Sequence, residues 1–160
     1  MFGKTVGTIF ILLSALSTVI TYYRQCRFRQ EYMAELIWSL EHIATEIRWK
    51  HRTLPDIFEE LSNRPCCGKT FQKLMLNMKS GMPLQISWQK AFSENECEIE
   101  TIMTHADLSG DEKHLTEGLL YLAGELKRAL RTEKEKQKEK GKMVIALTGG
   151  GAGLLIILLM

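Results

Sequence analysis

The residues of this chain that could do chemistry are its four cysteines and four histidines. The adjacent pair Cys66-Cys67 could bind a soft metal or take part in disulfide exchange. No second cysteine pair is present to complete a tetrahedral site, and no two histidines follow a spacing such as H-E-x-x-H. The irregular cysteine spacing is typical of a reduced compartment. We therefore expect no metal site.

The carboxylates and glycines also fail to form a recognisable catalytic motif. Asp107, Asp111 and the glutamates have positions typical of helix caps and solvated helix faces. The glycines at 149–153 lie in an apolar run with no following Lys-Ser/Thr, so they do not form a phosphate-binding loop. A net charge of +2 is too small to indicate a nucleic-acid partner. We expect a protein that is not an enzyme, with no catalytic residues, no cofactor and no small-molecule substrate.

The two ends of the chain are apolar, and the middle is not. Residues 5–23 are nineteen positions without a charge, and residues 143–160 are eighteen more. As helices rising about 1.5 Å per residue, both runs nearly match a hydrocarbon core of about 30 Å. We predict transmembrane helices at 5–23 and 143–160, enclosing a water-facing domain at 24–142. A cleaved signal peptide at the first run, or a GPI-type tail at the second, is the weaker alternative.

Basic residues flank both runs on the side of the central domain. They are Arg24, Arg27 and Arg29 after the first run, and Lys134, Lys136, Lys138, Lys140 and Lys142 before the second. The other flanks carry only Lys4 and the chain termini. Basic loops stay in the cytoplasm and favour anionic headgroups, so we expect a two-pass protein of the cell membrane whose central domain is cytoplasmic and contacts lipid.

Apolar residues of the central domain recur every three or four positions, which predicts helices and no strands. The first helix should run from the membrane to about Lys50. Short helices should begin near Pro55, after a break ending at Gly68, and near Pro83. Residues expected to face the core include Leu40, Ile43, Trp88, Leu119 and Leu122.

Two capping boxes predict the last two helix starts, Ser93 with Glu96 and Ser109 with Glu112. The sixth helix has a leucine stripe and then a Lys/Glu-rich stretch at 131–142, where oppositely charged residues three apart favour its continuation into the second apolar run. The predicted fold is all-α, a cytoplasmic six-helix bundle between two terminal transmembrane helices.

Two surfaces are candidates for binding partners. Gly149 and Gly153 form a G-x-x-x-G pattern that would let another transmembrane helix approach closely. Charged residues gather at the turn after the first long helix, about 40 Å from the bilayer if that helix is straight. The charged residues proposed for partner binding are Arg48, Lys50, Arg52, Glu59 and Glu60.

The order of these features resembles the stage III sporulation protein AB family over essentially the whole chain. The resemblance is carried by LEHIATEI at 40–47, TLP at 53–55, MPL at 82–84 leading to Trp88, Ala91 and Phe92, and LSGD at 108–111. Where that pattern usually has Leu-Gly, a second upstream Gly and a Gln after the Asp, this chain has His105-Ala106-Asp107 and His114.

The resemblance implies a cytoplasmic helical domain similar to that of the type II secretion inner-membrane platform protein. It also implies a place in the mother-cell membrane around the forespore, beside a secretion-type ATPase and other membrane proteins of a channel-like complex. We expect a non-catalytic platform that docks the ATPase. The alternative is a two-span sensor or receptor with a helical ligand-binding domain, but such a domain normally faces outward, and the basic flanks predict the opposite side.

Overall fold

A computed structural model describes residues 2–93, 97–108 and 110–159. All secondary structure in the described residues is helical. The chain divides into two compact units, which we describe separately: unit 1 is Met1–Gln30 with Thr132–Met160, and unit 2 is Glu31–Arg131.

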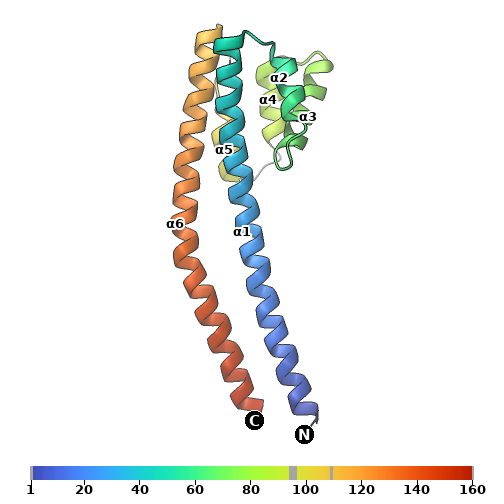
Figure 1. Cartoon of the computed structure of the whole chain (residues 1–160), viewed down its shortest axis with the longest axis vertical. Coiled ribbons are helices and arrows are strands. Elements are labelled where there is room, and N and C mark those ends of the chain that lie inside the picture. Colours follow the sequence, from blue (N-terminus) through green and yellow to red (C-terminus); the bar gives the residue numbers. More distant parts are fainter. Residues whose placement is uncertain (1, 94–96, 109, 160) are drawn as a thin grey trace. The chain divides into compact units, whose positions relative to one another are not determined.

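The described residues form six helices, as the sequence predicts, and the two outer helices are much longer than the four between them (Figure 1). The first, α1, continues to Lys50, where the sequence predicted its end. The helix bounds are α1 Phe2–Lys50, α2 Leu54–Leu61, α3 Gly68–Lys79, α4 Leu84–Phe92, α5 Cys97–Thr104 and α6 Glu112–Leu159.

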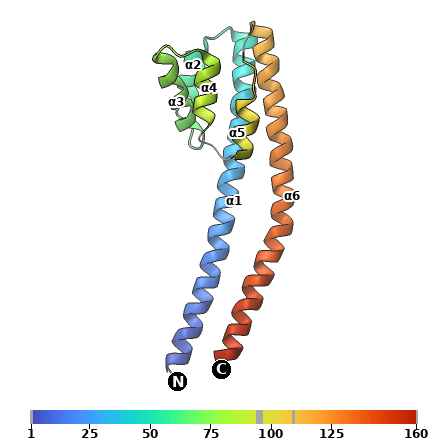
Figure 2. The same ribbon diagram turned by 180° about the vertical axis from the view of Figure 1, so that it is seen from behind.

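Within unit 2, the α1 and α6 segments lie side by side, and α2, α3 and α4 pack together (Figures 1 and 2). The buried aromatic residues of the core all come from α2, α3 and α4, whereas α1 and α6 contribute aliphatic residues and Met33. The Phe58 and Phe71 ring centroids lie 6.0 Å apart, and those of Trp88 and Phe92 lie 4.7 Å apart. The five residues predicted to face the core are all buried: Leu40, Ile43, Trp88, Leu119 and Leu122.

Prolines and glycines fix the short helices at the predicted places. Pro55 occupies the first turn of α2, where its missing N–H costs no helical hydrogen bond. Pro83 is the N-cap of α4, and Gly81 before it has φ +85°, a conformation that suits glycine. Gly68 begins α3 against the Ser62 carbonyl, where an added Cβ would lie 2.5 Å from the oxygen.

The predicted capping boxes fall partly on Glu96 and Ser109, which lie outside the described residues. Ser93 lies at the C-terminal end of α4, where its hydroxyl donates to the Lys90 carbonyl at 3.0 Å. The start of α6 is capped by Asp111, whose carboxylate accepts the His114 N–H at 3.0 Å.

Unit 1 consists of the remaining segments of α1 and α6, which lie side by side with their outer ends at the same end of the unit (Figure 2). Gly141 allows close approach, because an added Cβ would lie 2.8 Å from the Tyr23 hydroxyl. Arg29 pairs with Glu133 at 3.9 Å, and the Gln30 amide donates to Gln137. Over the described residues, neither long helix contains an apolar stretch that meets the length and hydropathy of a membrane span.

Candidate functional site

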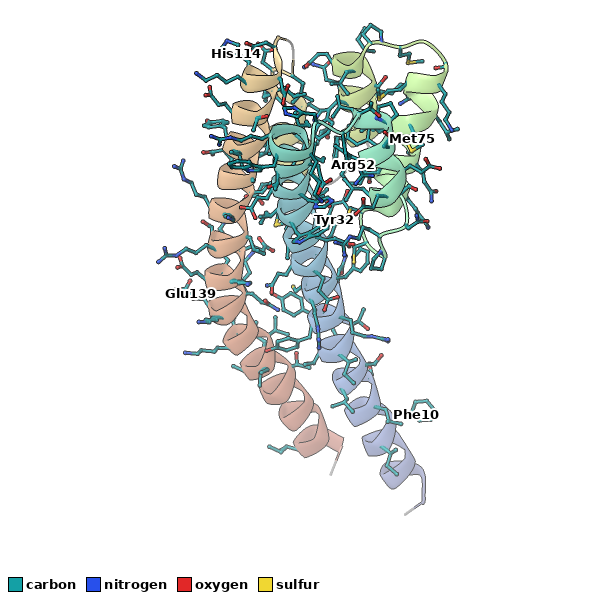
Figure 3. The ribbon with its side chains drawn as sticks, turned by 45° about the horizontal axis from the view of Figure 1, so that its top comes forward. Phe10, Tyr32, Arg52, Met75, His114 and Glu139 are labelled. Atoms are coloured by element: carbon teal, nitrogen blue, oxygen red, sulfur yellow. The ribbon has the colours of Figure 1, made fainter. Side chains whose placement is uncertain are left out.

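The charged turn predicted as a docking site lies between α1 and α2, near the start of α6. We call residues 48–53 the α1–α2 turn; Figure 3 labels Arg52 within it. Its backbone reverses at His51, a non-glycine residue with φ +49° whose N–H bonds the Ile47 carbonyl at 3.3 Å. The His51 ring lies 3.3 Å from the Glu112 carboxylate, which joins the turn to the first residue of α6.

A buried carboxylate organises this turn. Glu46 on α1 is only 3% exposed. Lys50 reaches one carboxylate oxygen of Glu46 at 2.7 Å, and Arg52 reaches the other at 3.2 Å. Arg52 also bonds Glu60 on α2 at 2.9 Å. We call Glu46, Lys50, Arg52 and Glu60 the carboxylate clasp.

The ion pairs of the clasp shift the pKa values of Glu46, Arg52 and Glu60 toward their charged forms. The Lys50 ammonium is the main cause of a lowered pKa at Glu46, and it outweighs the opposing effect of burial. The Arg52 guanidinium lowers the pKa of Glu60, while Glu60 and then Glu46 raise the pKa of Arg52. Glu46, Arg52 and Glu60 are therefore held in their charged forms, and the clasp fixes the angle at which the chain leaves α1.

Arg48 and Trp49 remain outside this clasp and face solvent. The Trp49 side chain is 73% exposed, and the Arg48 guanidinium lies 5.6 Å from the centre of its ring, a cation–π arrangement. Arg48 also lines a hollow of about 480 Å³ whose other walls come from the first turns of α6. These residues are Asp111, which caps the helix, and Glu112, Lys113, Thr116, Glu117 and Leu120 of α6.

The predicted docking residues thus divide into two groups. Lys50, Arg52 and Glu60 are brought together, but in contacts within the chain. Arg48 is directed outward, and Glu59 is exposed on α2. Trp49 was not among the residues predicted for partner binding. The signal that could have identified it is an aromatic residue next to an arginine in the last turn of a helix. The roles of these residues in partner binding stay predictions.

A second aromatic group joins α1 to the segment before α3. The Trp38 ring stacks on His42 with centroids 4.7 Å apart, and the Arg64 guanidinium lies 3.6 Å from the centre of the same ring. His42 in turn lies 3.2 Å from Glu60 of the clasp. Both partners of Trp38 come from this chain, so the stack contributes to the fold of unit 2.

The cysteine pair lies where α1 meets the start of α3. Burial raises the pKa of the Cys67 thiol to about 11, and its sulfur lies 3.5 Å from the Ser39 hydroxyl. Burial likewise raises the pKa of Cys66, whose N–H donates to Glu35 at 2.8 Å. A raised pKa leaves little thiolate at neutral pH, so this pair is poorly suited to redox exchange. Among the described residues, no three His, Cys, Asp or Glu side chains gather as metal ligands.

The predicted membrane-packing glycines have open surroundings within the chain. A Cβ added at Gly149 or Gly153 would meet no atom within 4 Å. This is the free space that a second helix would need, and the packing role of both residues stays a prediction.

Comparison with known proteins gives one family match. The family model described as stage III sporulation protein AB matches residues 4–160, nearly the full chain. No curated protein and no solved structure matches.

Proposed function

Because the chain belongs to the stage III sporulation protein AB family, whose description indicates a role in sporulation, we propose that it acts as a non-catalytic platform. In this proposal a cytoplasmic helical domain is held at the mother-cell membrane around the forespore. It docks a secretion-type ATPase and holds other membrane proteins of a channel-like complex, in the manner of the type II secretion platform protein.

The surface at the α1–α2 turn carries this proposal. Tryptophan and arginine are the residue types that most often dominate binding energy at protein interfaces. Here they are adjacent, with Trp49 73% exposed and Arg48 over its ring. The carboxylate clasp holds the turn before any partner arrives, which lowers the entropy lost on binding.

Contacts within the chain support a platform without chemistry of its own. Glu46, Glu60 and His42 take part in ion pairs or close contacts around the turn. Cys67 is buried with a raised pKa. These side chains are ones that general acid–base or nucleophilic catalysis could use, and here they stabilise the fold.

Membrane attachment through residues 5–23 and 143–160 remains part of the proposal. Two observations support it: both runs lack charged residues, and the basic flanks lie on the side of the central domain. The helices α1 and α6 also continue from unit 2 without interruption as far as Phe2 and Leu159.

Capture of the ATPase by the full-length protein in detergent tests the docking surface. Arg48→Glu combined with Trp49→Ala should lower capture by about tenfold or more, since each residue type can contribute over 1 kcal/mol at an interface. Leu76→Ala is the matched control, because Leu76 is 66% exposed on α3. Arg52 is left intact so that the clasp persists.

Undiminished capture by the Arg48/Trp49 variant, with a normal circular-dichroism spectrum, would rule out the turn as the docking site. Nucleotide hydrolysis by the purified chain alone would instead rule out the platform role.

A further inference from the structure

A second hollow of about 840 Å³ lies between residues 101–107, in α5 and just after it, and residues 114–125 of α6. Neither Arg48 nor Trp49 of the proposed ATPase contact lines it, although Glu117 lines both this hollow and the one beside Arg48. Along α6 its lining runs from His114 to Glu125, eleven positions or about 16 Å of helix. We call this hollow the α5–α6 groove. Figure 3 labels His114, the first α6 residue of its lining.

The groove combines an apolar floor with an exposed ring. Ile102 and Ala106 from the α5 side and Leu122 from α6 line it. Beside them Tyr121 is 66% exposed, although its neighbour Leu122 is buried. Gly118 brings the two sides close, because an added Cβ would lie 3.1 Å from the Asp107 carbonyl. An exposed aromatic ring over a small apolar surface is typical of a protein-binding groove.

Carboxylates outnumber the other titratable groups of the groove. Its lining includes the carboxylates of Asp107, Glu117 and Glu125 and the imidazoles of His105 and His114, and neither lysine nor arginine. Glu125 is bonded by Arg128 at 2.6 Å, but the Arg128 side chain is 80% exposed. Such an exposed pair contributes little energy and can be exchanged for a partner's cation.

We propose that the α5–α6 groove binds a basic amphipathic helix of a partner protein. Glu117 and Glu125 are eight positions apart on α6, or about 12 Å. A partner helix with Lys or Arg seven or eight residues apart can reach both carboxylates. An apolar side chain on the same face of that helix then covers Tyr121 and Leu122.

The charge pattern excludes other classes of occupant. Lipid headgroups of the anionic type and nucleic acids carry negative charge, which the three carboxylates repel. A neutral helix would take water away from Glu117 and Glu125 without supplying a cation, which costs free energy. A basic helix supplies cations to both carboxylates.

Site-specific crosslinking in sporulating cells tests the proposal on the full-length protein. The photoreactive residue p-benzoylphenylalanine replaces Tyr121, and a second strain carries it in place of Leu76, which has the same 66% exposure. The Tyr121 position should give an adduct that maps to a Lys/Arg-rich helical segment of another protein. The Leu76 position should not give this adduct.

Charge reversal then tests the basis of recognition. Glu117→Lys should reduce the Tyr121 adduct by about tenfold, because like charges across an interface are strongly unfavourable. Glu139→Lys on the same helix is the matched control and should leave the yield unchanged, since Glu139 does not line the groove. Glu117→Gln gives an intermediate loss and covers the case in which the lysine variant fails to fold.

Three results would overturn the proposal. One is an adduct on a second copy of this chain or on a segment without basic residues. Another is an adduct yield no higher than at Leu76, and the third is a yield that Glu117→Lys and Glu117→Gln leave unchanged. Loss of the ATPase contact in the Arg48/Trp49 variant with the Tyr121 adduct intact would show that the two surfaces act separately.

Discussion

Glu46 shows how a single side chain can direct the path of the chain. A buried carboxylate is costly unless cations and hydrogen bonds compensate it. Here two cations on the same turn, Lys50 and Arg52, reach its two oxygens. Because Arg52 also bonds Glu60 on α2, the ion pairs fix the exit from α1 and the entry into α2 together.

The clasp should make the stability of the folded chain depend on pH in the acidic range. The folded-state pKa values of Glu46 and Glu60 are lowered from the ordinary 4.5, so both carboxylates stabilise the fold above that pH. This contribution disappears as pH falls through the lowered values. The melting temperature of a fragment covering residues 26–138 should therefore be steady near neutrality and fall below about pH 4.5.

Glu46→Gln removes one of the two titrating groups without changing the side-chain size. It should lower the melting temperature at pH 7, because Lys50 and Arg52 lose their buried partner. It should also make the decline in acid shallower than in the unsubstituted fragment. Glu59→Gln on exposed α2 surface is the control, and an acid decline of the same steepness in all three proteins would contradict the role of the clasp.

At the scale of the element, α4 holds the C-terminal end of α5. The last carbonyls of a helix have no partner within the helix. Trp88 donates its ring N–H to the Met103 carbonyl at 2.9 Å. Gln85 donates to the Ala106 carbonyl at 2.6 Å and accepts the Leu108 N–H at 2.9 Å, so one amide pairs with two backbone groups of the connection to α6.

Gln85→Leu should test this role. Loss of the amide leaves a part-buried carbonyl and N–H unpaired, at a cost of about 1–3 kcal/mol in the free energy of unfolding. Gln89→Leu is a matched control, because Gln89 is exposed and its bond to Thr104 is long at 3.4 Å; it should change stability by less than about 0.5 kcal/mol. Urea unfolding measures both, and equal values would contradict the assignment.

The leucine stripe of α6 can be tested with two adjacent residues. Leu119 is 1% exposed and Leu120 is 44% exposed. Leu119→Ala should cost about 2–5 kcal/mol by opening a core cavity, whereas Leu120→Ala should cost less than about 0.5 kcal/mol. Thermal melting of the fragment covering residues 26–138 distinguishes the two variants. Similar melting temperatures would mean that the stripe does not face the core in solution.

At the scale of the whole molecule, the prediction concerns the proposed membrane attachment and the side of the membrane on which unit 2 would then lie. Cys66 and Cys67 are unsuitable reporters, because burial raises the pKa of both thiols and slows their reaction. An exposed thiol introduced by Leu76→Cys is a better one. We expect a membrane-impermeant thiol reagent to leave this variant unlabelled in intact cells and to label it after lysis.

The unsubstituted chain gives the background from its native cysteines. Labelling of Leu76→Cys in intact cells above that background would place the central domain outside. It would also favour the sensor alternative over the platform.

The sequence by itself determined the helical class, the end of α1 and the starts of α2, α3 and α4. It also identified five residues of the core, Leu40, Ile43, Trp88, Leu119 and Leu122. The physical reason is that these features depend on local properties: apolar residues at helical spacing, and backbone constraints at Pro55, Pro83 and Gly81. It also carried the family resemblance, since this rests on the order of motifs along the chain.

Only the tertiary structure decided how the charged and polar side chains are used. Periodicity cannot show that Glu46 is buried, since its contacts include Arg52, which lies beyond the end of its own helix and also bonds Glu60 on the helix that follows. The Gln85 contacts join positions 21 and 23 residues apart, and the α5–α6 groove needs two helices to form its walls. Such features arise from packing between segments that are distant in the sequence. The contacts of a charged or polar side chain therefore depend on which other segment lies next to it.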